Sequence, residues 1–302
     1  MSDNTDFVIK VNGVSKDYGK AHVLDNMTFS VPKGSIFGLV GRNGAGKTTI
    51  MRIMSGLQKP TSGTVEYGFD HKKLGNIGAL VELPSIYSNA SARDNLIYQY
   101  INLGLKIDET IDQNLAFVGL GDTGKKKAGK FSLGMRQRLG IAMAMAGNPE
   151  LLILDEPING LDPQGIIQIR EVLEKLNKER GVTIIISSHI LSELAKLATD
   201  FAFVEKGRVV KEARSEAVEN AGGLVSEFYS ANPEKLIPVL NAKGLITTYD
   251  NASGVVFAKG YYNLTNIVLA ANDAGANIAR VVTKETDLET YFVNLVGGES
   301  HA

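Results

Sequence analysis

One eight-residue segment constrains the fold of this chain more than any other. It reads GRNGAGKT over residues 41–48 and fits the pattern G-x-x-x-x-G-K-[ST]. A short apolar run at residues 35–40 precedes it, and a helical pattern begins at Lys47. A buried strand, a glycine-rich turn and a helix in this order form the context in which such a segment wraps around a phosphate group. The segment therefore predicts a phosphate-binding loop.

The residue types of this loop indicate what it binds. Glycines let consecutive backbone N–H groups point at an oxyanion, and the following helix adds the positive end of its dipole. The motif places Lys47 at the β- and γ-phosphates of a nucleotide and the Thr48 hydroxyl on Mg²⁺. Thr49 is the expected donor to the α-phosphate. We therefore expect ATP and Mg²⁺ as cofactors, with nucleotide contacts from Gly41, Asn43, Gly44, Ala45, Gly46, Lys47, Thr48 and Thr49.

A second motif is an apolar run at residues 151–154 that ends in Asp155 and Glu156. In open parallel sheets, ligands bind outside the carboxyl ends of the strands. Asp155 would hold Mg²⁺ there through water, as the acidic strand end of phosphate-loop ATPases does. Glu156, one residue further on, would accept a proton from the attacking water, which makes it the predicted catalytic base.

Strand-like and helical stretches alternate along the first two thirds of the chain. A further buried-strand run lies at residues 182–187, and helical patterns lie at 135–146 and 165–179. This alternation predicts an α/β core with a mostly parallel sheet. A hairpin at residues 203–210 closes the core, and we expect the nucleotide-binding domain to span residues 1–220.

The remaining residues, 221–302, are expected to form a small accessory α+β domain. It is predicted to contain strand-like runs at residues 236–240, 254–258 and 278–282, a helix at 264–274 and an amphipathic helix at 287–296. Three roles stay open for this domain: regulation, stabilisation of a dimer, or ligand binding.

Charge and composition limit the partners of the chain. Lys and Arg number 32 against 33 Asp and Glu, so no basic excess indicates a nucleic-acid partner, and we expect none. The chain has no Cys, which excludes a thiol nucleophile and a Cys-based zinc site. No apolar run approaches the roughly 20 residues of a membrane helix, and the first residues lack the pattern of a signal peptide. We expect a cytoplasmic protein that reaches a membrane only by docking to another protein.

A third motif, FSLGMRQR at residues 131–138, lies just upstream of the acidic strand. It resembles the signature, usually written LSGGQ, of the ATP-binding-cassette (ABC) ATPases, and the resemblance to this family covers about residues 7–215. The resemblance implies a phosphate-loop NTPase core with an antiparallel β subdomain and a helical subdomain at about residues 89–147. It also implies that Ser132 and Gly134 contact ATP held by a second copy of the domain. Leu133 stands in place of the usual first glycine, and Met135 in place of the usual glutamine.

Further positions match the family one by one. Tyr18 falls where a ring stacks on adenine, Asp162 ends a segment NGLD that resembles the D-loop, and His189 matches the switch histidine at the γ-phosphate. Glu82 departs from the common pattern, because it fills the slot of a glutamine that touches Mg²⁺ or the attacking water. The resemblance therefore puts Glu82 in the catalytic and metal sites. With Glu82 and the run NASARDNL at residues 89–96, the sequence resembles the ATPases of lantibiotic-immunity and bacitracin-type exporters.

The resemblance implies an ATP-binding and ATP-hydrolysing subunit that powers a separate integral-membrane permease for export of, or immunity to, an antimicrobial peptide or antibiotic. Two cassettes would pair on binding ATP, as a homodimer or as a heterodimer with a related ATPase. The complex would lie at the inner face of the cell membrane. Two alternatives stay open: a transporter for another cargo, and a soluble ATPase that acts on ribosomes or DNA. The signature argues against a third, a small-substrate kinase.

Overall fold

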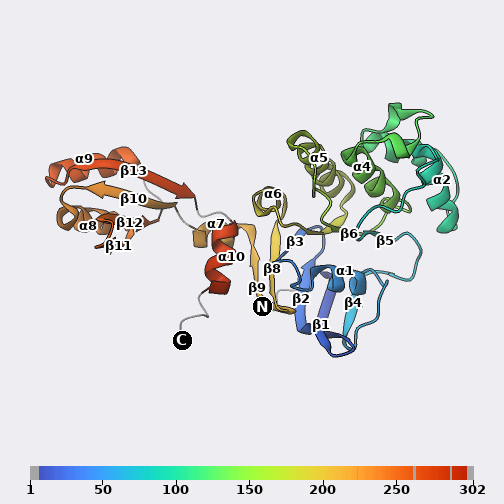
Figure 1. Cartoon of the computed structure of the whole chain (residues 1–302), viewed down its shortest axis with the longest axis horizontal. Coiled ribbons are helices and arrows are strands. Elements are labelled where there is room, and N and C mark those ends of the chain that lie inside the picture. The colour runs from blue at the N-terminus through green and yellow to red at the C-terminus, as the bar shows by residue number, and fades with distance from the viewer. Residues whose placement is uncertain (1–6, 223, 261–262, 286–287, 298–302) are drawn as a thin grey trace. The chain divides into compact units, whose positions relative to one another are not determined.

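The computed structural model describes residues 7–222, 224–260, 263–285 and 288–297, and the chain divides into two compact units (Figure 1). The units span Met1–Ser215 and Glu216–Ala302. The boundary predicted at residue 220 falls within helix α7 (Ser215–Gly222). None of the described helices is both long enough and apolar enough to span a lipid bilayer.

A six-stranded sheet forms the centre of the first unit, in the order β5-β6-β7-β3-β8-β9. Neighbouring strands run parallel except β9, which pairs antiparallel with β8. Every residue of β3, β6 and β7 is buried, as expected for parallel strands that are covered on both faces. The six strands are β3 (Ile36–Val40), β5 (Ile77–Leu80), β6 (Leu151–Asp155), β7 (Thr183–Ser187), β8 (Asp200–Glu205) and β9 (Arg208–Arg214).

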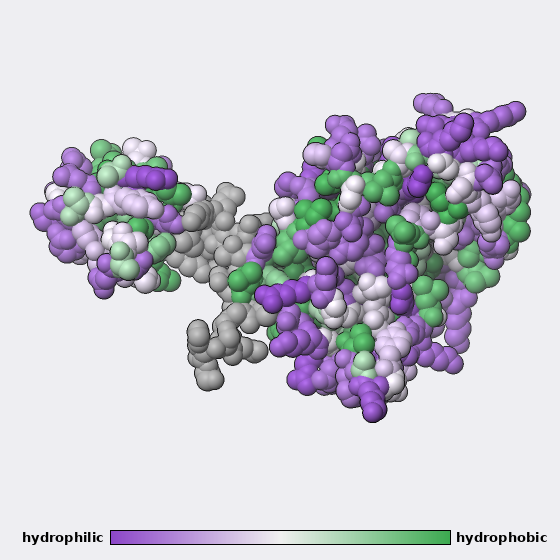
Figure 2. All heavy atoms as spheres, in the orientation of Figure 1, coloured by the Kyte–Doolittle hydropathy of each residue, from purple (hydrophilic) through white to green (hydrophobic). Residues whose placement is uncertain are grey.

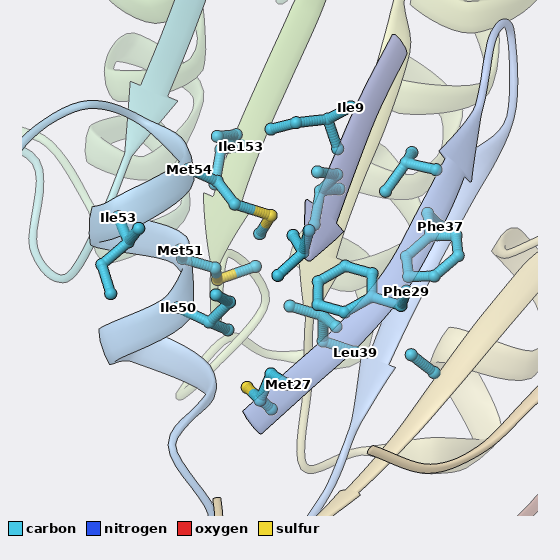
Figure 3. Close-up of a cluster of buried hydrophobic side chains, with 14 of the residues drawn as sticks. Ile9, Met27, Phe29, Phe37, Leu39, Ile50, Met51, Ile53, Met54 and Ile153 are labelled. Carbon is cyan, nitrogen blue, oxygen red and sulfur yellow. The ribbon is translucent and has the colours of Figure 1, made fainter. Parts of the chain in front are cut away.

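A second sheet of the first unit is antiparallel, in the order β2-β1-β4, and the helix after the phosphate loop lies between the two sheets. Figure 3 shows Met51 and Met54 of this helix on the side that faces strand residues such as Phe29 and Ile153. The rings of Phe29 and Phe37 stack with centroids 5.8 Å apart. The elements are β1 (Phe7–Tyr18), β2 (Ala21–Pro32), β4 (Ser62–Tyr67) and α1 (Lys47–Met54).

The other face of the central sheet is covered by α5 (Pro163–Arg180) and α6 (Leu191–Leu197), which pack against β7 and β3 (Figure 1). Between β5 and β6 the chain forms a helical subdomain. A capping box begins its first helix, because Ser91 Oγ accepts from the Asp94 N–H at 3.1 Å and Asp94 Oδ2 accepts from the Ser91 N–H at 3.2 Å. The subdomain contains α2 (Ala92–Asn102), α3 (Thr110–Phe117), the short 3₁₀ turns η1 (Gly121–Thr123) and η2 (Ala128–Lys130), and α4 (Leu133–Ala144).

The second unit contains an antiparallel sheet in the order β11-β12-β10-β13. Phe228 on β10 packs against Leu236 and Ile267 of the two helices that connect the strands. The elements are β10 (Leu224–Ser230), α8 (Pro233–Ala242), β11 (Ile246–Asp250), β12 (Val255–Lys259), α9 (Leu264–Asp273), β13 (Ile278–Glu285) and α10 (Leu288–Gly297). Asp287, the first residue of the predicted terminal helix, lies outside the described residues.

One predicted element of this unit is wrong. The apolar run at residues 236–240 predicts a strand, but these residues belong to helix α8. Leu236 and Leu240 are both fully buried, and a spacing of four residues places them on one face of a helix. Pro233 at the start of α8 suits a first helical position, which has no intrahelical N–H bond to lose. A five-residue apolar run does not distinguish a strand from a buried helical segment.

Candidate functional site

The phosphate loop joins the end of β3 to the start of α1, and two of its glycines, Gly41 and Gly46, leave no room for side chains. Gly46 has φ of 105°, and a Cβ atom there would lie 2.5 Å from Leu24 Cδ2. A Cβ atom on Gly41 would lie 2.5 Å from the carbonyl oxygen of Val204. Only glycine fits both positions, so the backbone N–H groups stay free to approach a ligand closely.

Lys47 lies inside this loop and is 7% exposed. Its Nζ atom donates to the carbonyl oxygens of Gly41 at 2.7 Å and Arg42 at 3.3 Å. Burial lowers the pKa of the Lys47 ammonium, and the negative charges of Glu156 and Asp155 oppose that shift. The loop therefore holds a largely desolvated cation next to two carboxylates, an arrangement suited to a polyanionic ligand with a divalent cation.

Asp155 at the end of β6 joins three parts of the core. It is 5% exposed, and it accepts from Thr48 Oγ1 at 2.7 Å and from Ser187 Oγ at 2.6 Å. A hydroxyl and a carboxylate are hard oxygen donors, the kind that Mg²⁺ takes in a site with few protein ligands and several waters. The Thr48 and Asp155 oxygens therefore fit the predicted Mg²⁺.

Sequence reasoning missed Ser187, the last residue of β7. Its hydroxyl donates to Asp155 and accepts from the backbone N–H of Glu156 at 3.0 Å. Ser187 therefore aligns both acidic residues from the neighbouring strand. A signal was present, because a polar residue that ends a buried apolar run points to the same sheet edge as Asp155.

Glu156 is held by the segment that follows β7. Its Oε2 atom lies 2.7 Å from His189 Nδ1 and accepts from the His189 backbone N–H at 3.2 Å. The φ angle of Glu156 is 51°, a left-handed conformation that is uncommon for a residue other than glycine and that often marks a functional position. The arrangement orients one carboxylate oxygen and leaves the other available for a proton.

These residues surround a pocket of about 230 Å³. It brings together most of the predicted loop residues and both acidic residues. The lining residues are Val23, Asn43, Gly44, Gly46, Lys47, Thr48, Thr49, Asp155 and Glu156. Three predicted residues do not line the pocket. Gly41 and Ala45 belong to the same loop, and His189 contacts the lining residue Glu156.

Tyr18 and Glu82 also lie outside this pocket. Tyr18 is 43% exposed at the end of β1, and its hydroxyl donates to Gln58 Oε1 at 2.7 Å. Glu82 follows β5, has φ of 69° and forms an ion pair with Arg52 of α1. Glu82 therefore contacts α1 at Arg52, one helical turn beyond Thr48, and it is not among the residues that line the pocket.

The signature residues and Asp162 of the D-loop-like segment lie at the starts of two helices. Ser132 caps α4, where its Oγ atom accepts from the Met135 N–H at 3.3 Å, and Gly134 follows in the first turn. Asp162 caps α5, where its Oδ1 atom accepts from the Gly165 N–H at 3.0 Å. Neither cap lines the pocket of the same chain. Their helix N-termini expose backbone N–H groups that suit an anion brought from outside.

Comparisons with known proteins agree with this geometry. The family model described as ABC transporter matches residues 24–159. The bacitracin transport ATP-binding protein BcrA of Bacillus licheniformis is 40% identical over 301 residues, which cover 96% of this chain and 98% of that protein. The lantibiotic transport ATP-binding protein SrtF of Streptococcus pyogenes is 44% identical over 216 residues, which cover 70% of this chain and 93% of that protein.

Among solved structures, a dimeric post-hydrolysis state of the ATP-binding cassette MJ0796, bound to ADP and Pi, superposes with a TM-score of 0.60. It is 26% identical in sequence, and the match covers 68% of this chain and 98% of that one. The similarity in fold thus extends to a dimeric cassette that holds the products of ATP hydrolysis.

Proposed function

This chain belongs to the family of ABC transporter ATP-binding proteins, and on that premise we propose that it hydrolyses ATP to power export of a peptide antibiotic through a separate membrane permease. One observation carries the choice of cargo. The match to the bacitracin transport protein extends over both units, whereas the match to the lantibiotic transport protein covers only 216 residues. The second unit is therefore a feature shared with a bacitracin-type relative, and bacitracin is the first cargo to test.

The catalytic residues act on ATP seated in the pocket. Lys47 and the loop amides bind the phosphates, and Thr48 with Asp155 would hold Mg²⁺, which would neutralise negative charge on the phosphates. A water molecule attacks the γ-phosphorus as the bond to the bridging oxygen of ADP breaks. Glu156 takes the proton of that water, while His189 holds the Glu156 carboxylate from the other side at 2.7 Å.

A second cassette completes each site. Ser132 and Gly134 do not line the pocket of their own chain, yet they present a helix N-terminus that suits the γ-phosphate of ATP bound to a partner cassette. Two copies of this chain, or this chain and a related ATPase, would enclose two nucleotides between them. Closure on ATP and opening after hydrolysis would drive the permease.

The permease would dock on a groove of about 230 Å³ between β5 and helices α2 and α4. Leu57, Leu83 and Leu103 line it, and Leu57 and Leu83 are 69% and 76% exposed. Figure 2 shows apolar residues at the surface of the first unit where Figure 1 places α2, which carries the exposed Ile101. A groove lined mainly by apolar residues fits the apolar face of a short amphipathic helix. Docking there would hold the chain at the inner face of the membrane.

The function is tested by resistance in a bacitracin-sensitive bacterial host. Co-expression of the chain with its permease is expected to raise the minimal inhibitory concentration of bacitracin several-fold. Lys47→Ala is the matched control, because it removes the main cation on the phosphates and should abolish the protection. Protection against a lantibiotic alone would change the cargo, and equal protection by wild type and Lys47→Ala would contradict ATP-driven export.

Glu82 adjoins this groove through Leu83, and its substitution tests whether it couples ATP to transport. Glu82→Gln is expected to leave nucleotide affinity unchanged, because Lys47 and the loop dominate binding. ATPase activity should fall slightly and bacitracin resistance much more, since a neutral amide pairs more weakly with a cation. The measurement is the ratio of resistance to ATPase activity, relative to wild type.

A matched variant separates two explanations of that result. Arg52→Gln breaks the same ion pair from the α1 side, and such exposed pairs contribute only about 0–1 kcal/mol to stability. If Arg52→Gln lowers the ratio as strongly as Glu82→Gln, the Arg52 pair carries the effect. If only Glu82→Gln lowers it, Glu82 meets the permease. A ratio near one for both variants would mean that Glu82 does not couple transport.

A further inference from the structure

The signature segment and the segment after Glu156 pack against each other in one chain through a reciprocal contact. Leu133 Cδ2 lies over Gly160, 3.3 Å from where a Cβ atom on that glycine would stand. In return, Leu161 Cδ2 lies over Gly134, 3.7 Å from the corresponding position. Each leucine thus sits on the glycine of the other segment, and Gly160, with φ of 72°, leaves the space that Leu133 fills. We refer to these four residues as the leucine–glycine contact.

The two leucines of this contact adjoin different functional residues: Leu133 adjoins Ser132, and Leu161 is linked to Glu156. Leu133 directly follows Ser132, the cap of α4, so the two move together at the start of that helix. On the other side, the Asn159 N–H donates to the Glu156 carbonyl at 3.2 Å, and the Leu161 N–H donates to Ile158 at 3.4 Å. Pro157 and Ile158 between them are buried. A displacement of Leu161 therefore reaches the backbone of Glu156 through a short, hydrogen-bonded turn.

We infer that Leu133 is a positioning residue that links the two composite sites through a single chain. The inference rests on the proposed function, in which Ser132 acts on the partner's ATP and Glu156 acts on the ATP of its own chain. ATP from the partner draws Ser132 into place, Leu133 moves with it, and the contact with Gly160 and Leu161 sets the carboxylate of Glu156 for proton transfer. Hydrolysis at one site then depends on occupancy of the other.

The residue type at position 133 is what makes this link possible. A glycine there, as in the usual signature of the family, would have no side chain to reach Gly160. Leu133 is 40% exposed, so its packing on Gly160 is not a requirement of a closed core. Exposure also allows a competing explanation, a direct contact between Leu133 and the second cassette, and the experiment has to separate the two.

A double-mutant cycle on purified wild-type and variant chains makes that separation. Leu133→Ala and Leu161→Ala are each expected to lower kcat about three- to tenfold, with the KM for ATP unchanged. The Hill coefficient for ATP should fall towards one in both. Because both side chains serve the same contact, the double variant should be no slower than the slower single variant.

Two further variants control the cycle. Ile167→Ala truncates an equally exposed apolar side chain, 39% exposed on α5, outside the leucine–glycine contact, and should leave kcat unchanged. Leu133→Met keeps the volume and the apolar character of the side chain, so it should keep kcat and cooperativity. Thermal unfolding of all variants identifies any loss that comes from instability.

The outcomes are distinct. Losses that multiply in the double variant would overturn the inference, because Leu133 would then act on another partner, such as the second cassette. Unchanged kcat and Hill coefficient in Leu133→Ala would overturn it as well. If wild type itself hydrolyses no ATP, the proposed function fails; if wild type is active and the losses multiply, only the role of Leu133 fails.

Discussion

Glu156→Gln is expected to lower ATP turnover by about 10²–10⁴-fold, the loss typical of a missing general base, while ATP still binds. The amide keeps an acceptor for the His189 N–H but cannot take a proton from water. ATP would then remain bound, and the two cassettes would stay closed around it. Phosphate release measures the turnover, and size-exclusion chromatography with Mg·ATP should show a stable dimer.

Glu171→Gln is a suitable control for this variant. Glu171 is an exposed residue of α5 outside the pocket, so the same chemical change there should leave turnover and oligomeric state as in wild type. A Glu156→Gln chain that hydrolyses ATP normally and remains a monomer would contradict both the catalytic base and the paired cassettes.

Ser132→Arg is expected to abolish ATP hydrolysis and ATP-driven dimerisation while ATP binding by the single chain stays near normal. Ser132 lies outside the pocket of its own chain, so the bulky side chain blocks the ATP of a partner. Mixing the variant with Lys47→Ala should restore at most one of the two composite sites. Fluorescent ATP-analogue titration measures binding, and phosphate release measures hydrolysis.

The change also removes a helix cap, which alone costs about 0.5–2 kcal/mol of stability. Ser132→Ala provides the control, because it removes the same cap bond from the Met135 N–H without adding bulk. It should therefore dimerise better than Ser132→Arg. Full ATPase activity in Ser132→Arg would mean that the signature does not act across a dimer.

The chemistry-bearing segments were predictable because each is encoded locally. The loop from Gly41 to Thr48 and the strand end at Asp155 each carry strand, turn and residue type within a few positions. The rule that parallel strands place their carboxyl ends at one edge also predicted that they would meet. In the structure, Thr48 Oγ1 and Asp155 Oδ2 lie 2.7 Å apart across 107 residues of sequence.

What could not be predicted depends on contacts between distant side chains. The resemblance predicts Glu82 near Mg²⁺, and that role stays a prediction; its partner in the structure is Arg52, one turn after Thr48 on α1, and no local pattern encodes that pair. Ser187 carries the signal of a polar strand end, but its hydrogen bonds to Asp155 and Glu156 follow only once β7 is placed beside β6. The sequence does not identify helix α8, because a short apolar run is compatible with both a helix and a strand. Packing against Phe228 decides in favour of the helix.

The order of strands in the central sheet has a consequence for folding of the chain during its synthesis on the ribosome. β3, which leads into the phosphate loop, pairs only with β7 and β8, so its first partner begins at Thr183. At about 5–20 residues per second, the ribosome needs roughly 7–30 s to make the intervening segment. During that interval both edges of an entirely apolar strand lack their native partners, and such edges promote aggregation. β3 can therefore acquire its native partners only after β7 has left the ribosome, and the hydrogen bonds that join Thr48, Asp155 and Ser187 form only then.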